Sequence, residues 1–135
     1  MDNEVKVSIA KDKYKTEVNY GKHLIIADEP TDVGGTDLGM PPTSLFLSSL
    51  GTCKVMTMRM YADRKGWDLQ TAQIRLSSEV VKSEQQQTTY IKCHITITGD
   101  LDDEQRQRIY KIADRCPIQK IISNPIVIES NLLSN

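Results

Sequence analysis

The chain has 135 residues, of which 39% are hydrophobic and 26% charged, and its formal net charge is −1. A chain of this length can bury the core of one domain without disulfide bonds, so we expect a single domain over residues 1–135. The balanced charge gives no bulk attraction to nucleic acid or to an anionic membrane surface. The sequence has no stretch of about 20 apolar residues that would span a bilayer, and its start, MDNEVKVSIAKDKYK, lacks the apolar core of a signal peptide. These features predict a cytoplasmic protein that binds neither nucleic acid nor a membrane.

The first segment, from Val5 to Ile26, places isolated valines and isoleucines among polar residues. This pattern predicts two or three β-strands joined by short turns. The next stretch, DEPTDVGGTDLGMPP, is rich in proline, glycine and acidic residues and predicts an irregular loop. A loop this long in a small domain more often serves function than not.

The longest helical pattern begins at Pro42 and ends at Gly66, directly after two basic residues. Between Leu45 and Met58 the only charged residue is Lys54. A helix that is apolar on every face has to be covered on every face. We therefore expect this helix to lie between a sheet and another helix, which a second subunit can supply.

Period-two patterns follow the helix. Residues 73–82 and 88–100 predict two strands joined by a turn at SEQQQ. In the second strand the buried face is expected to consist of alternate apolar residues, namely Ile91, Cys93, Ile95 and Ile97.

The last third of the chain predicts two helices and a strand. Asp102 is a candidate N-cap with Gln105 at the capping-box position, and Pro117 ends this helix and opens a short one. The apolar stripe of the longer helix consists of Ile109, Ile112, Ala113 and Cys116. Residues 127–133, VIESNLL, predict a final edge strand. Together these elements predict an α+β fold with antiparallel sheets.

Three cysteines are an odd number for a disulfide framework, and their wide spacing fits no zinc finger or ribbon. No phosphate-binding or dinucleotide-binding motif is present, so we expect neither a metal nor a cofactor. Cys93 alternates with isoleucines on a strand and is interpreted as a small buried residue.

Cys53 lies in the middle of the long helix, where its neighbours Ser48, Ser49, Gly51 and Thr52 are all small. Small residues on a buried helix indicate close approach, either by a second helix or by a substrate that reaches the sulfur. The helix dipole does not activate this thiol, because Cys53 lies more than two turns inside the helix. A reactive Cys53 therefore needs a cation from elsewhere.

Cys116 precedes Pro117 and is a candidate N-cap of the last helix, with Arg115 and Lys120 near it in sequence. Free backbone N–H groups at a helix N-terminus stabilise a thiolate, so local chemistry favours a lowered pKa at Cys116 over one at Cys53. A structural cap or core cysteine is the alternative interpretation.

Two stretches together resemble the OsmC/Ohr family of osmotically inducible and organic hydroperoxide resistance proteins. They are PTSLFLSSLGTCKVMTMRMYADRKGW at residues 42–67 and ITGDLDDEQRQRIYKIADRCPIQK at residues 97–120. The segment from His23 to Gly39 is similar to the OsmC-like branch that carries a HLIIADEP…GG…G pattern. The resemblance implies an intertwined homodimer in which antiparallel sheets from both subunits wrap around long central helices.

The resemblance also implies an activity, the reduction of organic hydroperoxides, and less efficiently of hydrogen peroxide, by a thiol mechanism. Cys53 matches the cysteine that attacks the peroxide, and Cys116 matches the one that resolves it as a disulfide. A dithiol would then restore both thiols, and a low pKa would make Cys116 the better leaving group in that step. Apolar residues near Cys53 and in the preceding loop are candidates to receive the organic part of the substrate: Leu50, Met56, Met60, Leu38 and Met40.

This sequence departs from the family at two positions. Active relatives use an arginine from the N-terminal strands and a glutamate at the start of the long helix, whereas here no arginine precedes Arg59 and the helix starts with Thr43 and Ser44. Candidate replacements are Lys15, Lys22 or His23 for the cation and Asp28 or Glu29 for the carboxylate, with Arg115 as a further cation. A lysine lacks the bidentate fork of arginine, so a non-peroxidatic relative that binds a hydrophobic small molecule at the dimer interface is an alternative.

Overall fold

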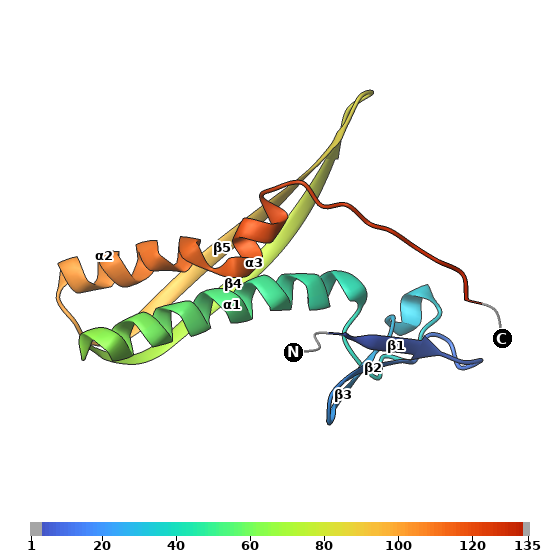
Figure 1. Ribbon diagram of the computed structural model, residues 1–135, viewed down its shortest axis with the longest axis horizontal. Coiled ribbons are helices and arrows are strands. Elements are labelled where there is room, and N and C mark those ends of the chain that lie inside the picture. The colour runs from blue at the N-terminus through green and yellow to red at the C-terminus, as the bar shows by residue number, and fades with distance from the viewer. Residues whose placement is uncertain (1–3, 134–135) are drawn as a thin grey trace. The chain divides into compact units, whose positions relative to one another are not determined.

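The computed structural model describes residues 4–133, and its ribbon is shown in Figure 1. The chain forms two compact units, one ending at Ser48 and the other beginning at Ser49. Each unit is described by itself below, and the single-domain expectation stays a prediction.

The first unit contains an antiparallel sheet of three strands in the order β1-β2-β3: Lys6–Ile9, Thr16–Tyr20 and His23–Ala27. This confirms the strands expected between Val5 and Ile26. Gly21 in the tight turn between β2 and β3 has a φ of +56°, which glycine adopts without steric cost. Val7 and Ile9 of β1 are 59% and 55% exposed, so part of the apolar surface of this sheet is open.

The loop after β3 is organised by a buried carboxylate, that of Asp28. Asp28 Oδ1 accepts the backbone N–H groups of Tyr14, Glu29 and Thr36 at 3.0, 2.7 and 3.4 Å. Asp28 Oδ2 accepts the Thr36 hydroxyl at 2.6 Å and the Leu38 N–H at 3.1 Å. These bonds close the loop onto a single side chain.

Two glycines allow this loop to close tightly. A Cβ at Gly35 would lie 2.0 Å from the Glu29 carbonyl oxygen, and one at Gly39 would lie 1.9 Å from the Ile26 carbonyl oxygen. No side chain fits against backbone at such distances. The GG…G pattern of the sequence therefore marks close backbone contacts in the loop.

Helix α1, Pro42–Lys65, has the predicted extent. It ends where Gly66 adopts a φ of +69° and the Trp67 N–H donates to the Ala62 carbonyl at 3.0 Å. Its buried residues from Leu50 onward are Leu50, Gly51, Lys54, Met58 and Ala62. The opposite face exposes Met56 and Met60 by 54% and 61%.

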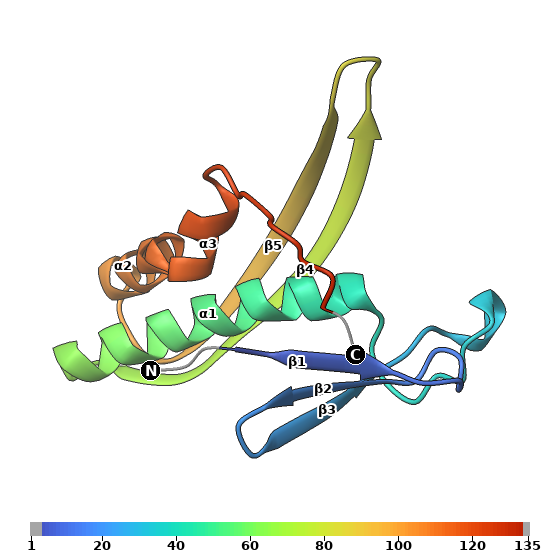
Figure 2. The ribbon, with the colours of Figure 1, turned by 45° about the vertical axis from the view of Figure 1, so that its right-hand side comes forward.

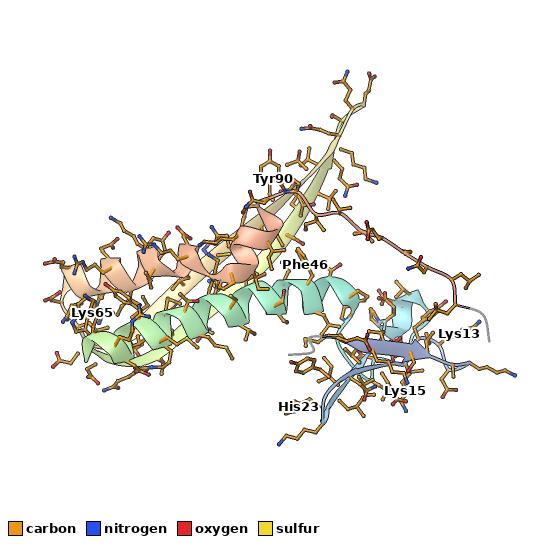
Figure 3. All side chains as sticks on the ribbon, viewed as in Figure 1. Lys13, Lys15, His23, Phe46, Lys65 and Tyr90 are labelled. Atoms are coloured by element: carbon orange, nitrogen blue, oxygen red, sulfur yellow. The ribbon has the colours of Figure 1, made fainter. Side chains whose placement is uncertain are left out.

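The second unit contains a long antiparallel hairpin formed by β4, Asp68–Lys82, and β5, Gln87–Asp100. The strands are those predicted, with β4 beginning five residues earlier than expected. Ile91, Cys93, Ile95 and Ile97 alternate in burial with their exposed neighbours, as the period-two pattern indicated. Figure 2 shows the end of this hairpin projecting beyond the helices, and Tyr90, labelled in Figure 3, is 54% exposed there.

Helix α2, Asp103–Ile112, begins with the predicted capping box between Asp102 and Gln105. A short 3₁₀ helix η2, Ala113–Arg115, and helix α3, Pro117–Ile122, follow it. The core of this unit joins α1, β4, α2 and η2 through Met58, Ala62, Leu69, Ile109 and Ala113. The sequence expectation of a helix in contact with both a sheet and a second helix is therefore met within one chain along this part of α1.

The predicted edge strand at residues 127–133 is wrong for the described chain. Residues 125–133 form no strand, and Val127 and Ile128 are 83% and 84% exposed. A β-strand is defined by pairing, and within residues 4–133 no strand pairs with this segment.

Candidate functional site

Two of the three cysteines come together in the second unit. Cys53, in the middle of α1, is half-buried, and Cys116, at the start of α3, has no exposed surface. The Cys53 side chain is close enough to Cys116 to raise the pKa of the Cys116 thiol. The two sulfur atoms are therefore neighbours, although the residues lie far apart in sequence.

Cys116 is the N-cap of α3, as predicted. Its Sγ accepts the Gln119 N–H at 3.3 Å, and Pro117 occupies the first turn of the helix. The predicted lowering of its pKa is nevertheless wrong: burial raises the pKa of the Cys116 thiol above its usual range. The Gln119 N–H and the charge of Lys54 lower the pKa of Cys116, but the loss of hydration and the neighbouring Cys53 outweigh them.

Lys54 supplies a cation at this pair that the sequence interpretation did not assign to it. Only 4% of Lys54 is exposed. Its Nζ donates to the Ala113 carbonyl at 3.4 Å, to Asp114 Oδ1 at 3.2 Å and to Gln119 Oε1. One feature of the sequence could have indicated this role: Lys54 is the only charged residue between Leu45 and Met58.

Gly51, one of the small residues near Cys53, is small for a different reason from those expected. A Cβ at Gly51 would lie 2.7 Å from Leu76 Cδ1 and 3.4 Å from Ile74 Cγ2, both of strand β4. The close approach at Gly51 is thus made by the sheet of the same chain, and neither a second helix nor a substrate is needed to explain it.

Cys93 shares a cavity with Lys54 and Gln119, two residues that contact the segment around Cys116. It lines this cavity of about 380 Å³ together with eight other residues, among them Leu50 and Lys54 of α1 and Gln119 and Ile122 of α3. Cys93 is half-buried, and it is the third free thiol of the chain. Its interpretation as a packing residue stays a prediction.

The residues expected to receive an organic substrate are separated by the fold. Leu50 is buried at the wall of this cavity, whereas Met56 and Met60 lie on the open face of α1. Leu38 and Met40 belong to the first unit, where they are 61% and 48% exposed. Their part in a substrate pocket stays a prediction.

The charged residues expected to support Cys53 are either exposed or engaged in contacts of their own. Lys15, Lys22 and His23 are exposed; Lys15 and His23 are labelled in Figure 3. The Asp28 carboxylate is engaged by the loop, and the Thr36 hydroxyl, together with the N–H groups around it, holds the pKa of Asp28 well below its usual range in spite of burial. Glu29 contributes its backbone N–H to that cluster, and Arg115 is exposed in η2 beside Cys116. No role of these residues at Cys53 follows from these contacts, and their support of the site stays a prediction.

Among residues 4–133, no group of three or more His, Cys, Asp or Glu side chains is arranged to hold a metal ion. Within the same residues, no helix has the length and apolar character that crossing a membrane requires.

Comparison with known proteins identifies the family to which this fold belongs. A family model described as OsmC-like protein matches residues 35–131, which is more than half of the chain. The chain therefore belongs to the OsmC-like family. No curated protein matches the sequence.

Solved structures of the same fold include an OsmC-like protein from Mycoplasma pneumoniae, with a TM-score of 0.70 and 17% identity over 91% of this chain and 89% of that one. An organic hydroperoxide resistance protein OsmC from Legionella pneumophila has a TM-score of 0.65 and 18% identity, covering 88% of each chain. The organic hydroperoxide resistance protein OhrB of Bacillus subtilis has a TM-score of 0.63 and 19% identity over 87% of this chain and 89% of that one. At these identities the comparisons establish a shared α+β fold with antiparallel sheets.

Proposed function

We propose that this protein is a thiol-dependent peroxidase that reduces organic hydroperoxides through a Cys53 sulfenic acid resolved by Cys116. The observation that carries the proposal is that the two cysteines are neighbours in the fold, close enough for Cys53 to raise the pKa of Cys116, because a resolving cysteine has to reach the sulfur that the peroxide oxidises. Family membership and the organic hydroperoxide resistance proteins among the structural neighbours support the same chemistry.

The different burial of the two sulfurs supports their order of action. Cys53 has exposed surface and Cys116 has none, so a peroxide from solvent meets Cys53 first. The Cys53 thiolate attacks one peroxide oxygen, an S–O bond forms, the O–O bond breaks, and the alcohol leaves after taking up a proton. The Cys116 thiolate then attacks the sulfenic sulfur, a disulfide forms, and hydroxide leaves to become water. An external dithiol reduces the disulfide and is itself oxidised to a disulfide, which completes the cycle.

Peroxide turnover by cysteine variants tests this proposal. Wild-type protein with a dithiol should consume cumene hydroperoxide, Cys53→Ser should abolish consumption, and Cys93→Ser should leave it unchanged. Cys116→Ser should allow a single oxidation without a Cys53–Cys116 disulfide. Equal consumption by wild type and Cys53→Ser would end the proposal.

We further propose that the protein works as an intertwined homodimer in the cytoplasm. Large apolar side chains are exposed on β1, on the open face of α1 and in the C-terminal segment, namely Val7, Ile9, Met56, Met60, Val127 and Ile128. In an intertwined dimer the partner subunit would cover apolar side chains of this kind. A single species of monomer mass in light scattering at micromolar concentration would contradict the dimer.

A second candidate function is the binding of a hydrophobic small molecule. The first unit contains an apolar cavity of about 450 Å³, lined in part by Val7, Ile9, Val18 and Leu45. This volume is typical of ligand pockets, and the lack of an arginine before Arg59 leaves the peroxidase incomplete by the family pattern. Native mass spectrometry of the purified protein would reveal a retained ligand. An empty protein that turns over peroxide would exclude this candidate.

A further inference from the structure

Lys54 is a buried cation whose hydrogen-bonding capacity is filled. Its ammonium group has three N–H donors and meets three acceptors, which are the Ala113 carbonyl, Asp114 Oδ1 and Gln119 Oε1. Its side chain is 6% exposed, whereas that of Asp114 is 71% exposed. The ion pair is therefore open to water on its acidic side, and the positive charge faces the protein interior.

The three acceptors flank Cys116 on both sides in sequence. The Ala113 carbonyl accepts both Lys54 Nζ and the Cys116 N–H, the latter at 3.3 Å. Gln119 accepts Lys54 through its side chain and donates its backbone N–H to Cys116 Sγ at 3.3 Å. One ammonium group thus ties α1, which carries Cys53, to the backbone turn that carries Cys116.

Burying a lysine costs free energy that an apolar residue of similar length would not, so a structural tie alone is a weak reason for a charge here. The charge has a local effect, because it lowers the pKa of the Cys116 thiol against the opposing effect of burial. A cation that stabilises a thiolate also stabilises the partial negative charge on a departing sulfur.

Access to solvent decides which sulfur departs during reduction. An external dithiol can reach Cys53, whereas Cys116 has no exposed surface. The attacking thiolate forms a bond to Cys53 Sγ, the Cys53–Cys116 bond breaks, and Cys116 Sγ leaves with the electron pair. The second thiol of the dithiol then displaces Cys53, and the dithiol departs as a disulfide.

We infer that Lys54 is the positioning residue that stabilises Cys116 as the leaving thiolate when a dithiol reduces the Cys53–Cys116 disulfide. This inference rests on the proposed disulfide and assigns the reductive half of the cycle to a residue next to Cys53 in sequence. A cation at this site could either activate Cys53 for attack on the peroxide or stabilise Cys116 as the leaving thiolate. Lys54 is assigned the second of these roles.

The rate at which dithiothreitol reduces the oxidised protein tests the inference without peroxide. The protein, with Cys93→Ser in the background, is oxidised with diamide, and free thiols are counted by alkylation and mass spectrometry. Lys54→Met should slow reduction about tenfold, because leaving-group rates fall as the thiol becomes more basic. Lys54→Arg should recover most of the rate, since it restores the charge.

Titration of the Cys116 thiolate separates an electrostatic role from a merely structural one. In protein with Cys53→Ser and Cys93→Ser, absorbance at 240 nm should give a higher Cys116 pKa for Lys54→Met than for Lys54. Asp114→Asn removes the exposed counter-charge and keeps the ammonium group, so it should lower the Cys116 pKa and speed reduction.

Reduction of folded Lys54→Met at the wild-type rate would overturn the inference. If Lys54→Met does not fold, Asp114→Asn decides: faster reduction supports the role of Lys54, and an unchanged or slower rate contradicts it. Failure of diamide to form a Cys53–Cys116 disulfide in wild type would instead count against the proposed function. The thiolate titration, which needs no disulfide, would still test whether Lys54 acts on Cys116.

Discussion

Asp28 in the first unit and Lys54 in the second are both buried charges, yet their partners differ in kind. Asp28 is 2% exposed and is surrounded by N–H and hydroxyl donors from within 14 residues of it in the chain. Lys54 is 4% exposed, and its acceptors are 59 to 65 residues away, around Cys116. Asp28, whose partners are near it in the chain, stabilises the local loop structure. Lys54, whose partners are distant in the chain and surround Cys116, is placed to influence the chemistry of the thiols.

The largest expected effect on stability comes from Asp28→Ala. This change leaves the part-buried N–H groups of Tyr14, Glu29 and Leu38 without their acceptor, and a donor shielded from water is costly to leave unpaired. We expect a lower melting temperature and rapid proteolysis within residues 28–39. Asp32→Ala, an exposed acid in the same loop, is the matched control and should change neither.

Lowering the pH should reduce the stability of the same loop, but by less than Asp28→Ala does. Because the pKa of Asp28 is depressed in the folded protein, its stabilisation is complete above the unfolded pKa of about 3.9 and is lost as pH falls below that value toward the folded pKa. Hydrogen exchange at the Leu38 amide should therefore accelerate in this range beyond its intrinsic pH dependence. Asp28→Asn, which cannot titrate, should show no such step, and an identical profile in both proteins would contradict the assignment.

Gly51→Leu probes the packing behind Cys53. A large side chain at this position would enter the space of Leu76 and Ile74, and overpacking of this kind costs about 1–3 kcal/mol. Chemical denaturation should report that loss, with Gly51→Ala losing less, because Leu76 Cδ1 is the end of a flexible side chain. Stability of Gly51→Leu equal to that of wild type would show that β4 does not approach the helix there.

Asp114→Asn should have the smallest effect on stability, about 0–1 kcal/mol, because the carboxylate is exposed and Lys54 keeps two other acceptors. A loss as large as that of Asp28→Ala would erase the distinction between the two buried charges. The comparison is sharpest when both variants are measured in one denaturation series.

Local patterns in the sequence predicted local features of the fold well. The alternation of residues 88–100, the capping box at Asp102 and the cysteine cap before Pro117 all depend on neighbours within a few residues. The prediction of an edge strand at residues 127–133 failed, because the sequence of this segment does not specify a strand that would pair with it.

The candidate site required information that a sequence pattern lacks. The capping position of Cys116 was predictable, but the direction of its pKa depends on burial created by packing against other elements. The sequence showed Lys54 as an isolated charge in an apolar helix. Its contacts with Ala113 and Gln119 depend on the fold and could not be predicted from the sequence. The family resemblance paired Cys53 with Cys116 where local chemistry alone favoured Cys116 as the more acidic thiol.

The central claim is that Cys53 and Cys116 act as one redox pair, and disulfide mapping after oxidation tests it most directly. Reduced protein treated with one equivalent of cumene hydroperoxide, then alkylated and digested, should contain a Cys53–Cys116 linked peptide with Cys93 alkylated. Over-oxidised Cys53 without that link, or a link that involves Cys93, would contradict the account.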